Sequence, residues 1–152
     1  MTERTTYDRA LTLLGVRARS IAELRRLLLR KGEPPADVEA AVDRLCEQRV
    51  LDDADFARQF ARARLLGTGA SRRRIVQELS RKGVARDVAE GAIRDLEDTA
   101  EVDPAAAARR TASKKWASLG TLDALTRRRR LYAFLARRGF DPDEIRVAVA
   151  EL

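Results

Sequence analysis

Apolar residues recur at intervals of three and four along most of the chain, and one arrangement of them occurs three times. Each copy is anchored on a glycine, which is Gly32, Gly83 or Gly139. Apolar residues lie eight and four positions before each glycine and six, nine, ten and thirteen positions after it, and two basic residues directly precede it. Self-similarity in one register predicts repeated supersecondary units that stack on one another. The apolar positions are Leu24, Leu28, Val38, Ala41, Val42 and Leu45, then Ile75, Leu79, Ala89, Ala92, Ile93 and Leu96, then Leu131, Leu135, Ile145, Ala148, Val149 and Leu152.

Each copy predicts a helix, a stop at the glycine and a second helix. Apolar residues four apart before the glycine, and three or four apart after it, lie on one face of a helix. The glycine occupies the position of a left-handed C-terminal cap. The two basic residues before it face the negative end of the helix dipole. The repeated unit is therefore an αα-hairpin with a basic end to its first helix.

The three glycines lie 51 and 56 residues apart (83 − 32 and 139 − 83), which leaves room for a third helix in each unit. Aromatic residues are 5% of the chain, and apolar alternation with a period of two is absent, so the predicted fold class is all-α. We predict three tandem three-helix modules, over residues 1–49, 50–98 and 99–152. They are expected to stack into an elongated, solenoid-like body of about 60 Å.

Capping residues predict where several helices begin. A first helix is expected from Thr6, and Ser20 with Glu23 forms a capping box for the second. Ser71 is the expected N-cap of a basic helix over residues 72–82. Asp103 with Pro104 is expected to cap an alanine-rich helix, since proline is favoured at the first helical position.

Three segments are predicted to lie between helices. Residues 50–53 form the joint between the first and second modules. The glycine turn at 67–69 could bind phosphate through backbone amides, because a basic helix follows it. That turn lacks the P-loop pattern, so an ordinary flexible connector is favoured. Residues 97–102 are acidic and aperiodic, and they are predicted to form a hinge into the third module.

The charge distribution suggests binding rather than catalysis. Lys and Arg number 31 against 24 Asp and Glu, a net charge of +7. The helix before each glycine is basic and the helix after it is mostly acidic, so stacked modules would have a basic flank and an acidic flank. Arginine runs of this kind indicate either phosphate contacts or a solvated surface. The basic flank consists of Arg25, Arg26, Arg30, Lys31, Arg72, Arg73, Arg74, Arg81, Lys82, Arg127, Arg128, Arg129, Arg130, Arg137 and Arg138.

Signals for catalysis are lacking in the sequence. Histidine is absent, Cys46 is the one cysteine, and no nucleotide loop or acidic metal cluster occurs. We therefore predict no enzymatic activity, no catalytic residue, no metal site and no cofactor. The chain has no apolar run of eighteen residues and no apolar N-terminal region, so a cytoplasmic protein with a reduced thiol is expected. Its charged surface favours a monomer.

Several short motifs stand out along the chain: Arg19-Ser20 with Glu23-Leu24, Arg30-Lys31-Gly32, Val50-Leu51-Asp52-Asp53 with Phe56-Ala57, Gly67-Thr68-Gly69 leading to Arg73-Arg74-Ile75, Glu78-Leu79, and Arg81-Lys82-Gly83-Val84. Together these motifs resemble those of the RecX family. The resemblance covers nearly the whole chain and is most specific over residues 50–84. Two positions depart from the family pattern: Glu33 stands where an aromatic residue is common, and Thr68 where tyrosine is common.

The resemblance implies a regulator that binds the RecA recombinase and its nucleoprotein filament. Such proteins modulate, typically inhibiting, filament extension, ATP hydrolysis and strand exchange in recombination, DNA repair and the SOS response. They have some affinity for DNA, and the expected partners of this chain include single-stranded and double-stranded DNA. On this interpretation the basic flank faces DNA phosphates or acidic surfaces of the filament.

Two alternatives of other classes stay open. A three-helix unit also resembles a helix-turn-helix reader of duplex DNA, but apart from Gln77 the basic helices lack the Asn and Gln that read adenine edges. A helical protein-binding adaptor would not depend on nucleic acid. Trp116 and Tyr132 could stack on bases, although packing in the core is the favoured interpretation for Trp116.

Overall fold

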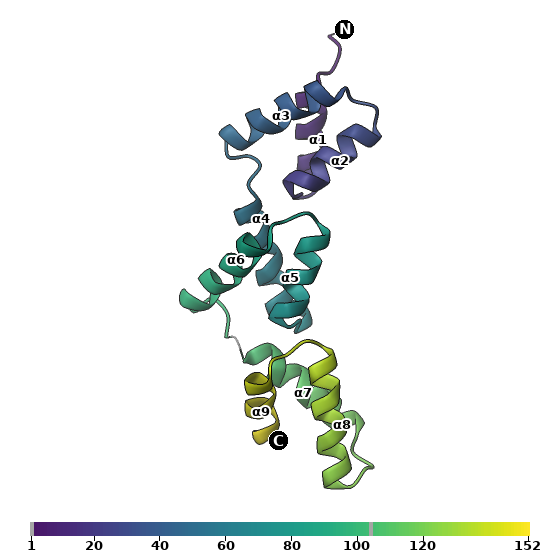
Figure 1. Ribbon diagram of the computed structural model, residues 1–152, viewed down its shortest axis with the longest axis vertical. Coiled ribbons are helices and arrows are strands. Elements are labelled where there is room, and N and C mark those ends of the chain that lie inside the picture. The colour runs from purple at the N-terminus through teal and green to yellow at the C-terminus, as the bar shows by residue number, and fades with distance from the viewer. Residues whose placement is uncertain (1, 104) are drawn as a thin grey trace.

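The computed structural model describes residues 2–103 and 105–152, with the side chain of Thr68 left undescribed. Those residues form nine α-helices, one short π-helical segment (η1) and connecting turns, with no strand among them. Figure 1 shows three groups of helices following one another along a single long axis. The predicted all-α fold of three tandem three-helix modules is confirmed. The elements are α1 (Thr6–Val16), α2 (Ile21–Arg30), α3 (Pro35–Glu47), α4 (Asp53–Ala63), η1 (Arg64–Thr68), α5 (Arg72–Arg81), α6 (Arg86–Asp98), α7 (Ala106–Ser118), α8 (Ala124–Arg137) and α9 (Pro142–Ala150).

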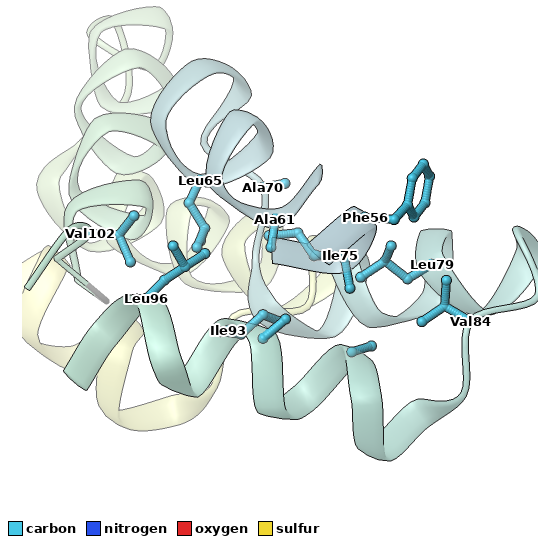
Figure 2. Close-up of a cluster of buried hydrophobic side chains, with 13 residues drawn as sticks. Phe56, Ala61, Leu65, Ala70, Ile75, Leu79, Val84, Ile93, Leu96 and Val102 are labelled. Carbon is cyan, nitrogen blue, oxygen red and sulfur yellow. The ribbon is translucent and has the colours of Figure 1, made fainter. Parts of the chain in front are cut away.

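Each module has its own hydrophobic core. The first lies among α1–α3, the second among α4–α6 with η1, and the third among α7–α9. Figure 2 shows the second core, where Ile75 and Leu79 from α5 meet Ile93 and Leu96 from α6. The repeat positions before each glycine are fully buried in all three modules. Leu152 is the exception to the predicted pattern, because α9 ends at Ala150 and leaves this side chain 38% exposed.

The three repeat glycines end α2, α5 and α8 as predicted. Gly32, Gly83 and Gly139 have φ of +86°, +82° and +93°, a region that side chains with a Cβ rarely adopt. The amide that follows each glycine donates to a carbonyl one turn back, as in the pair Val84 to Leu79 at 3.0 Å. This Schellman arrangement satisfies carbonyls that the helix end would otherwise leave unpaired.

The predicted caps of α2 and α5 are confirmed. Ser20 accepts from the Glu23 amide while Glu23 accepts from the Ser20 amide, and Ser71 accepts from the Arg74 amide. The predicted cap at Asp103–Pro104 lies partly outside the described residues, since Pro104 is not among them. Helix α7 begins at Ala106, and the Asp103 carboxylate accepts from the Ala105 amide at 3.0 Å.

Two segments predicted as connectors overlap the ends of helices. Residues 64–68 form η1, which extends α4 as one wide helical turn and places Leu65 in the second core. Helix α6 continues through Asp98, and Val102 lies in the second core near Leu96 (Figure 2). The predicted segment 97–102 is therefore corrected at its start, because residues 97 and 98 are helical, while residues 99–102 connect α6 to α7 with Val102 buried.

Glu33 replaces the apolar residue that follows the other two glycines, Val84 and Phe140. Its carboxylate is 8% exposed, accepts from the Thr6 hydroxyl at 2.5 Å and pairs with the Arg9 guanidinium. The hydrogen bond from Thr6 lowers the pKa of Glu33, so the group is held as an anion. In the first module an ionic contact thus joins the glycine turn to α1.

Among the described residues, no helix is long and apolar enough to cross a membrane.

Candidate nucleic-acid and partner interface

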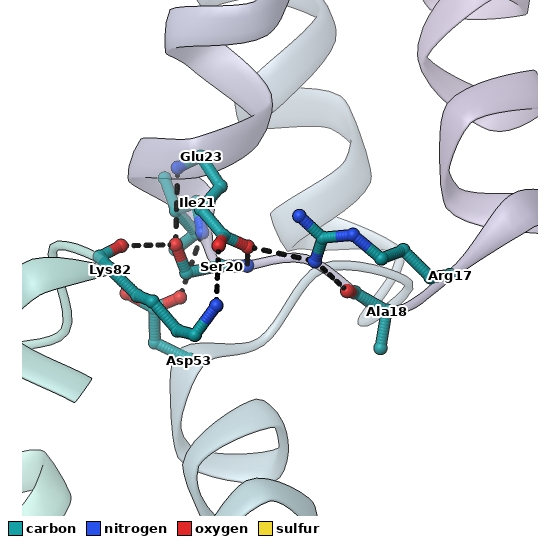
Figure 3. Close-up of polar contacts among 7 residues, drawn as sticks. All are labelled: Arg17, Ala18, Ser20, Ile21, Glu23, Asp53 and Lys82. Carbon is teal, nitrogen blue, oxygen red and sulfur yellow. Dashed lines mark hydrogen bonds and ion pairs between the residues drawn. The ribbon is translucent and has the colours of Figure 1, made fainter. Parts of the chain in front are cut away.

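The first and second modules meet through the start of α2 and the end of α5. Ser20 caps α2, and its hydroxyl also donates to the carbonyl of Lys82 at 2.5 Å. Asp53, at the start of α4, accepts from the amide of Ile21 at 2.8 Å. Figure 3 shows these groups gathered at the joint. Residues 50–53 therefore connect the two modules, as predicted, and polar contacts hold the modules against each other.

Glu23 adds a charged contact to the same joint. Its carboxylate lies 3.1 Å from the Lys82 ammonium and 3.3 Å from the Arg17 guanidinium (Figure 3). Burial raises the pKa of Glu23, but the hydrogen bonds from Lys82, the Ser20 amide and Arg17 outweigh it, and the pKa lies below its ordinary value. The joint therefore contains an ionised carboxylate shared by two modules.

The second and third modules repeat the contact. Ser71 caps α5 and donates to the carbonyl of Arg138, at the end of α8, at 2.8 Å. A Cβ on Gly139 would lie 2.8 Å from the Ser71 hydroxyl, and one on Gly83 would lie 2.3 Å from the Cβ of Ala22. Both glycines therefore permit a close approach between modules as well as a left-handed turn.

These joints place the basic helices in one column. The end of α5 meets the start of α2, and the end of α8 meets the start of α5. Figure 1 shows α2, α5 and α8 along one side of the long axis, with α3, α6 and α9 along the other. The basic flank of the sequence therefore maps onto a single column of helices.

Four of the fifteen basic-flank residues make ion pairs. Arg25 pairs with Glu39, Arg72 with Glu97 and Glu144, Arg74 with Glu78, and Lys82 with Glu23. The other eleven make no ion pair with any carboxylate in the described part of the chain. They are Arg26, Arg30, Lys31, Arg73, Arg81, Arg127, Arg128, Arg129, Arg130, Arg137 and Arg138.

The joint between α5 and α8 gathers part of this flank into a cleft of about 350 Å³. Five arginines line it, together with Gln77, Glu78 and Gly139. The rest of the flank is spread along the column, towards the end of α2 and the exposed face of α8. The five arginines are Arg73, Arg74, Arg81, Arg137 and Arg138.

The aromatic candidates separate into one packed residue and one exposed residue. Trp116 packs against the third core, and the Arg127 guanidinium lies 3.7 Å from its ring centroid. Arg127 also donates to the Trp116 carbonyl at 2.6 Å. Packing, the favoured interpretation, therefore accounts for Trp116, whereas Tyr132 is 42% exposed on α8.

A second basic cleft, of about 490 Å³, was missed by the repeat alignment. Arg110, Lys114 and Lys115 of α7 line it, opposite Arg138 and the glycine turn at 67–69. Their basic character is visible in the sequence, but α7 lies outside the aligned helices and the tertiary fold alone brings it to the turn. We refer to it as the α7 cleft.

The glycine turn itself is held by α7. Thr111 donates to the carbonyl of Gly69 at 3.2 Å, and Arg110 donates to the carbonyl of Leu65. The start of α5 is occupied by the Ser71 cap and by the end of α8. These contacts favour the connector over a phosphate site built from backbone amides at this turn.

Three family models match the chain in order. They describe the first three-helix domain of RecX over residues 7–45, the second over 52–93 and the third over 101–149.

Curated relatives give the same result. The chain is 37% identical over 140 residues to a regulatory protein RecX of Pelodictyon phaeoclathratiforme, covering 92% of this chain and 84% of that protein. It is 41% identical over 141 residues to one of Mycolicibacterium smegmatis, covering 91% and 74%.

Solved structures share the fold. The crystal structure of RecX from Lactobacillus salivarius superposes with a TM-score of 0.86 at 20% identity, covering 97% of this chain and 94% of that one. A second, of regulatory protein RecX, has a TM-score of 0.82 at 22% identity, with 94% and 70% covered.

Proposed function

The chain belongs to the RecX family of regulatory proteins, and we propose that it binds the RecA recombinase and its nucleoprotein filament. Binding inhibits filament extension, ATP hydrolysis and strand exchange. The basic flank is the proposed contact surface, and the protein acts as a cytoplasmic monomer without catalysis of its own. The module boundaries, between residues 49 and 50 and between residues 98 and 99, stay predictions.

The observation that supports this proposal most is the column of α2, α5 and α8. It presents eleven basic residues without carboxylate partners in the described chain, distributed over all three modules. A nucleoprotein filament offers DNA phosphates and acidic protein surfaces in a repeating array. A long positive surface gains affinity for such an array by releasing counterions and by electrostatic complementarity.

The three separate cores suggest how binding becomes inhibition. Each module has its own hydrophobic core, and the modules follow one another along the chain (Figure 1). Contacts by successive modules with successive RecA protomers would reinforce one another, because the second contact forms intramolecularly. Protomers tied together in this way are held in one relative arrangement, which opposes the changes that accompany ATP hydrolysis and the addition of further protomers.

The test is RecA's ATP hydrolysis on single-stranded DNA, titrated with this protein at physiological salt and at two DNA concentrations. We expect suppression at amounts well below that of RecA, unchanged by extra DNA, since the filament is the target. Suppression that appears only near saturation of the DNA, and that extra DNA relieves, would replace the proposal with simple competition for phosphates. No effect would leave duplex DNA binding or a protein adaptor as the function.

A further inference from the structure

We propose that the α7 cleft binds the sugar–phosphate backbone of single-stranded DNA directly, without RecA. Its cationic side chains are Arg110, Lys114 and Lys115 from α7 and Arg138 from the end of α8. The first three lie outside the basic flank. The inference thus assigns a site to the DNA affinity that the family resemblance implies, in a cleft of which only Arg138 belongs to the basic flank.

The α7 cleft differs from the other basic clefts in its charge balance. No Asp or Glu is among the described residues that line it. The cleft between α5 and α8 includes Glu78, and a cleft of about 670 Å³ between α5 and α6 includes Glu90 and Glu97. Four positive charges facing one concave space without a carboxylate repel one another and concentrate the positive potential there. An anion entering the α7 cleft would relieve that repulsion.

Three of the four cations are held in position by neutral partners. Arg110 donates to the Leu65 carbonyl, which fixes its guanidinium at the edge of the glycine turn. The Lys115 ammonium and the Arg138 guanidinium lie 4.8 Å and 5.2 Å from the centroid of the Phe134 ring. Neither contact neutralises a charge, because a carbonyl and a ring face are both uncharged. The cleft is thus ordered in advance and keeps its full positive charge, which lowers the entropic cost of binding.

Lys114 supplies the fourth charge. It is an exposed residue that lines the cleft, and it makes no ion pair in the described part of the chain. Fixed arginine forks with adjacent lysines suit phosphate, because a guanidinium donates two hydrogen bonds in one plane while an ammonium acts as a point charge.

The shape of the cleft favours a single strand. A concave space of about 490 Å³ admits a short stretch of backbone, whereas the phosphates of a duplex lie on a convex cylinder. Gly67 lines the same space, and a Cβ there would meet nothing within 4 Å, so no neighbouring atom fills the cleft beside this residue. Single-strand binding surfaces combine a positive groove with tolerance for any base. The expected contact is therefore with the backbone and independent of base sequence.

The experiment measures anisotropy of a fluorescein-labelled oligothymidylate with the protein alone, over a range of salt concentrations. The variant Lys114→Gln with Lys115→Gln should bind more weakly. Its salt slope should fall in magnitude by about 1.4, since each phosphate contact to a single strand contributes roughly 0.7. The control is Arg86→Gln with Arg146→Gln, which removes the same charge from exposed, ion-paired sites on α6 and α9 and should leave the slope unchanged. Lys114→Arg with Lys115→Arg should retain binding.

Three outcomes would overturn the proposal. Equal losses in the two Gln variants would mean that only net charge matters. An unchanged affinity and slope in Lys114→Gln with Lys115→Gln would remove the cleft from DNA binding. Displacement of the oligonucleotide by inorganic phosphate or polyglutamate as readily as by unlabelled oligonucleotide, at matched ionic strength, would make the cleft a general anion site. If the double variant unfolds, Lys114→Gln alone carries the test, with a slope change of about 0.7. RecA's ATP hydrolysis is measured separately, so that a failure of the proposed regulation is distinguished from a failure of DNA binding in the α7 cleft.

Discussion

The hydroxyl of Ser71 donates to the carbonyl of Arg138, 67 residues later in the chain, at 2.8 Å. The same hydroxyl accepts from the Arg74 amide and caps α5. One atom therefore begins a helix and joins two modules. Ser20 does the same with Lys82, so the contact recurs at each joint.

Replacement of either serine should cost more than an ordinary cap. Ser71→Ala loses the cap, worth about 1 kcal/mol, and leaves the Arg138 carbonyl without its donor, at about 1–3 kcal/mol. We expect a loss of about 2–4 kcal/mol in the free energy of unfolding, measured by urea denaturation followed by circular dichroism. Thr5→Ala is the control, because Thr5 caps α1 without touching another module, and it should lose about 1 kcal/mol. Equal losses would mean that the contact between modules contributes nothing.

Gly83→Ala should destabilise the protein more than Gly32→Ala. Both glycines have a positive φ, so both substitutions carry the left-handed penalty of about 1–2 kcal/mol. Only at Gly83 would the new methyl collide, at 2.3 Å from the Cβ of Ala22, while Gly32 faces open space. Urea unfolding compares the two free energies directly, and small-angle scattering should show a changed overall shape for Gly83→Ala only. A similar cost at both positions would contradict the close docking of the modules.

Ala100→Gly should stabilise the protein. Ala100 follows α6 with φ of +56°, although it has a Cβ. Glycine removes a left-handed penalty of about 1–2 kcal/mol and adds about 0.5–1 kcal/mol of chain entropy in the unfolded state, so the expected net gain is roughly 0.7 kcal/mol, the difference between the midpoints of the two ranges. Ala133→Gly, in the exposed middle of α8, should instead lose about 1 kcal/mol. The midpoints of thermal unfolding should move in opposite directions.

Glu23→Gln should alter the pH dependence of stability. The pKa of Glu23 lies below its ordinary value of 4.5, so its ionised form stabilises the folded state above that pH. This contribution is lost as the pH falls through the folded-state pKa. The variant should therefore be less stable than the parent at pH 7, with a difference that shrinks below pH 4.5.

Glu144→Gln is the counterpart of opposite sign. Burial raises the pKa of Glu144, so its ionised form opposes folding at neutral pH. Glutamine keeps the capping geometry at this position. Urea unfolding over a pH series should show Glu144→Gln equal to or more stable than the parent at pH 7. As the pH falls and the carboxylates are protonated, the stability of each variant should approach that of the parent, from below for Glu23→Gln and from above for Glu144→Gln.

Removal of unpaired arginines from the cleft between α5 and α8 should weaken action on RecA. Arg73, Arg81 and Arg137 line that cleft and make no ion pair among the described residues. We expect their combined replacement by Gln to raise the amount of protein needed for half-suppression of ATP hydrolysis and to flatten its salt dependence.

The matched control for that experiment is Arg62→Gln with Arg86→Gln and Arg146→Gln. It removes three charges that are already paired with carboxylates. Suppression by this control should stay close to that of the parent. If both triple variants lose the same activity, the effect belongs to net charge and not to the cleft.

Local sequence patterns are enough to predict the three modules, the glycine stops and the serine caps. All of these depend on interactions between residues three to five positions apart, such as the Val84 amide with the Leu79 carbonyl, and such interactions are written in local spacing. The charge pattern, with a basic helix before each glycine and a mostly acidic helix after it, is likewise visible in the sequence.

How the modules meet, and which charges lack a carboxylate partner in the described chain, depends on contacts between residues far apart in the sequence. The contact of Ser71 with Arg138 spans 67 residues, and that of Arg110 with Leu65 spans 45. Residues so far apart have no fixed offset that a repeat could reveal, and a serine cap looks the same whether or not its hydroxyl also has a distant partner. The α7 cleft exists because packing brings α7, α8 and the glycine turn together and places the neighbouring carboxylates elsewhere.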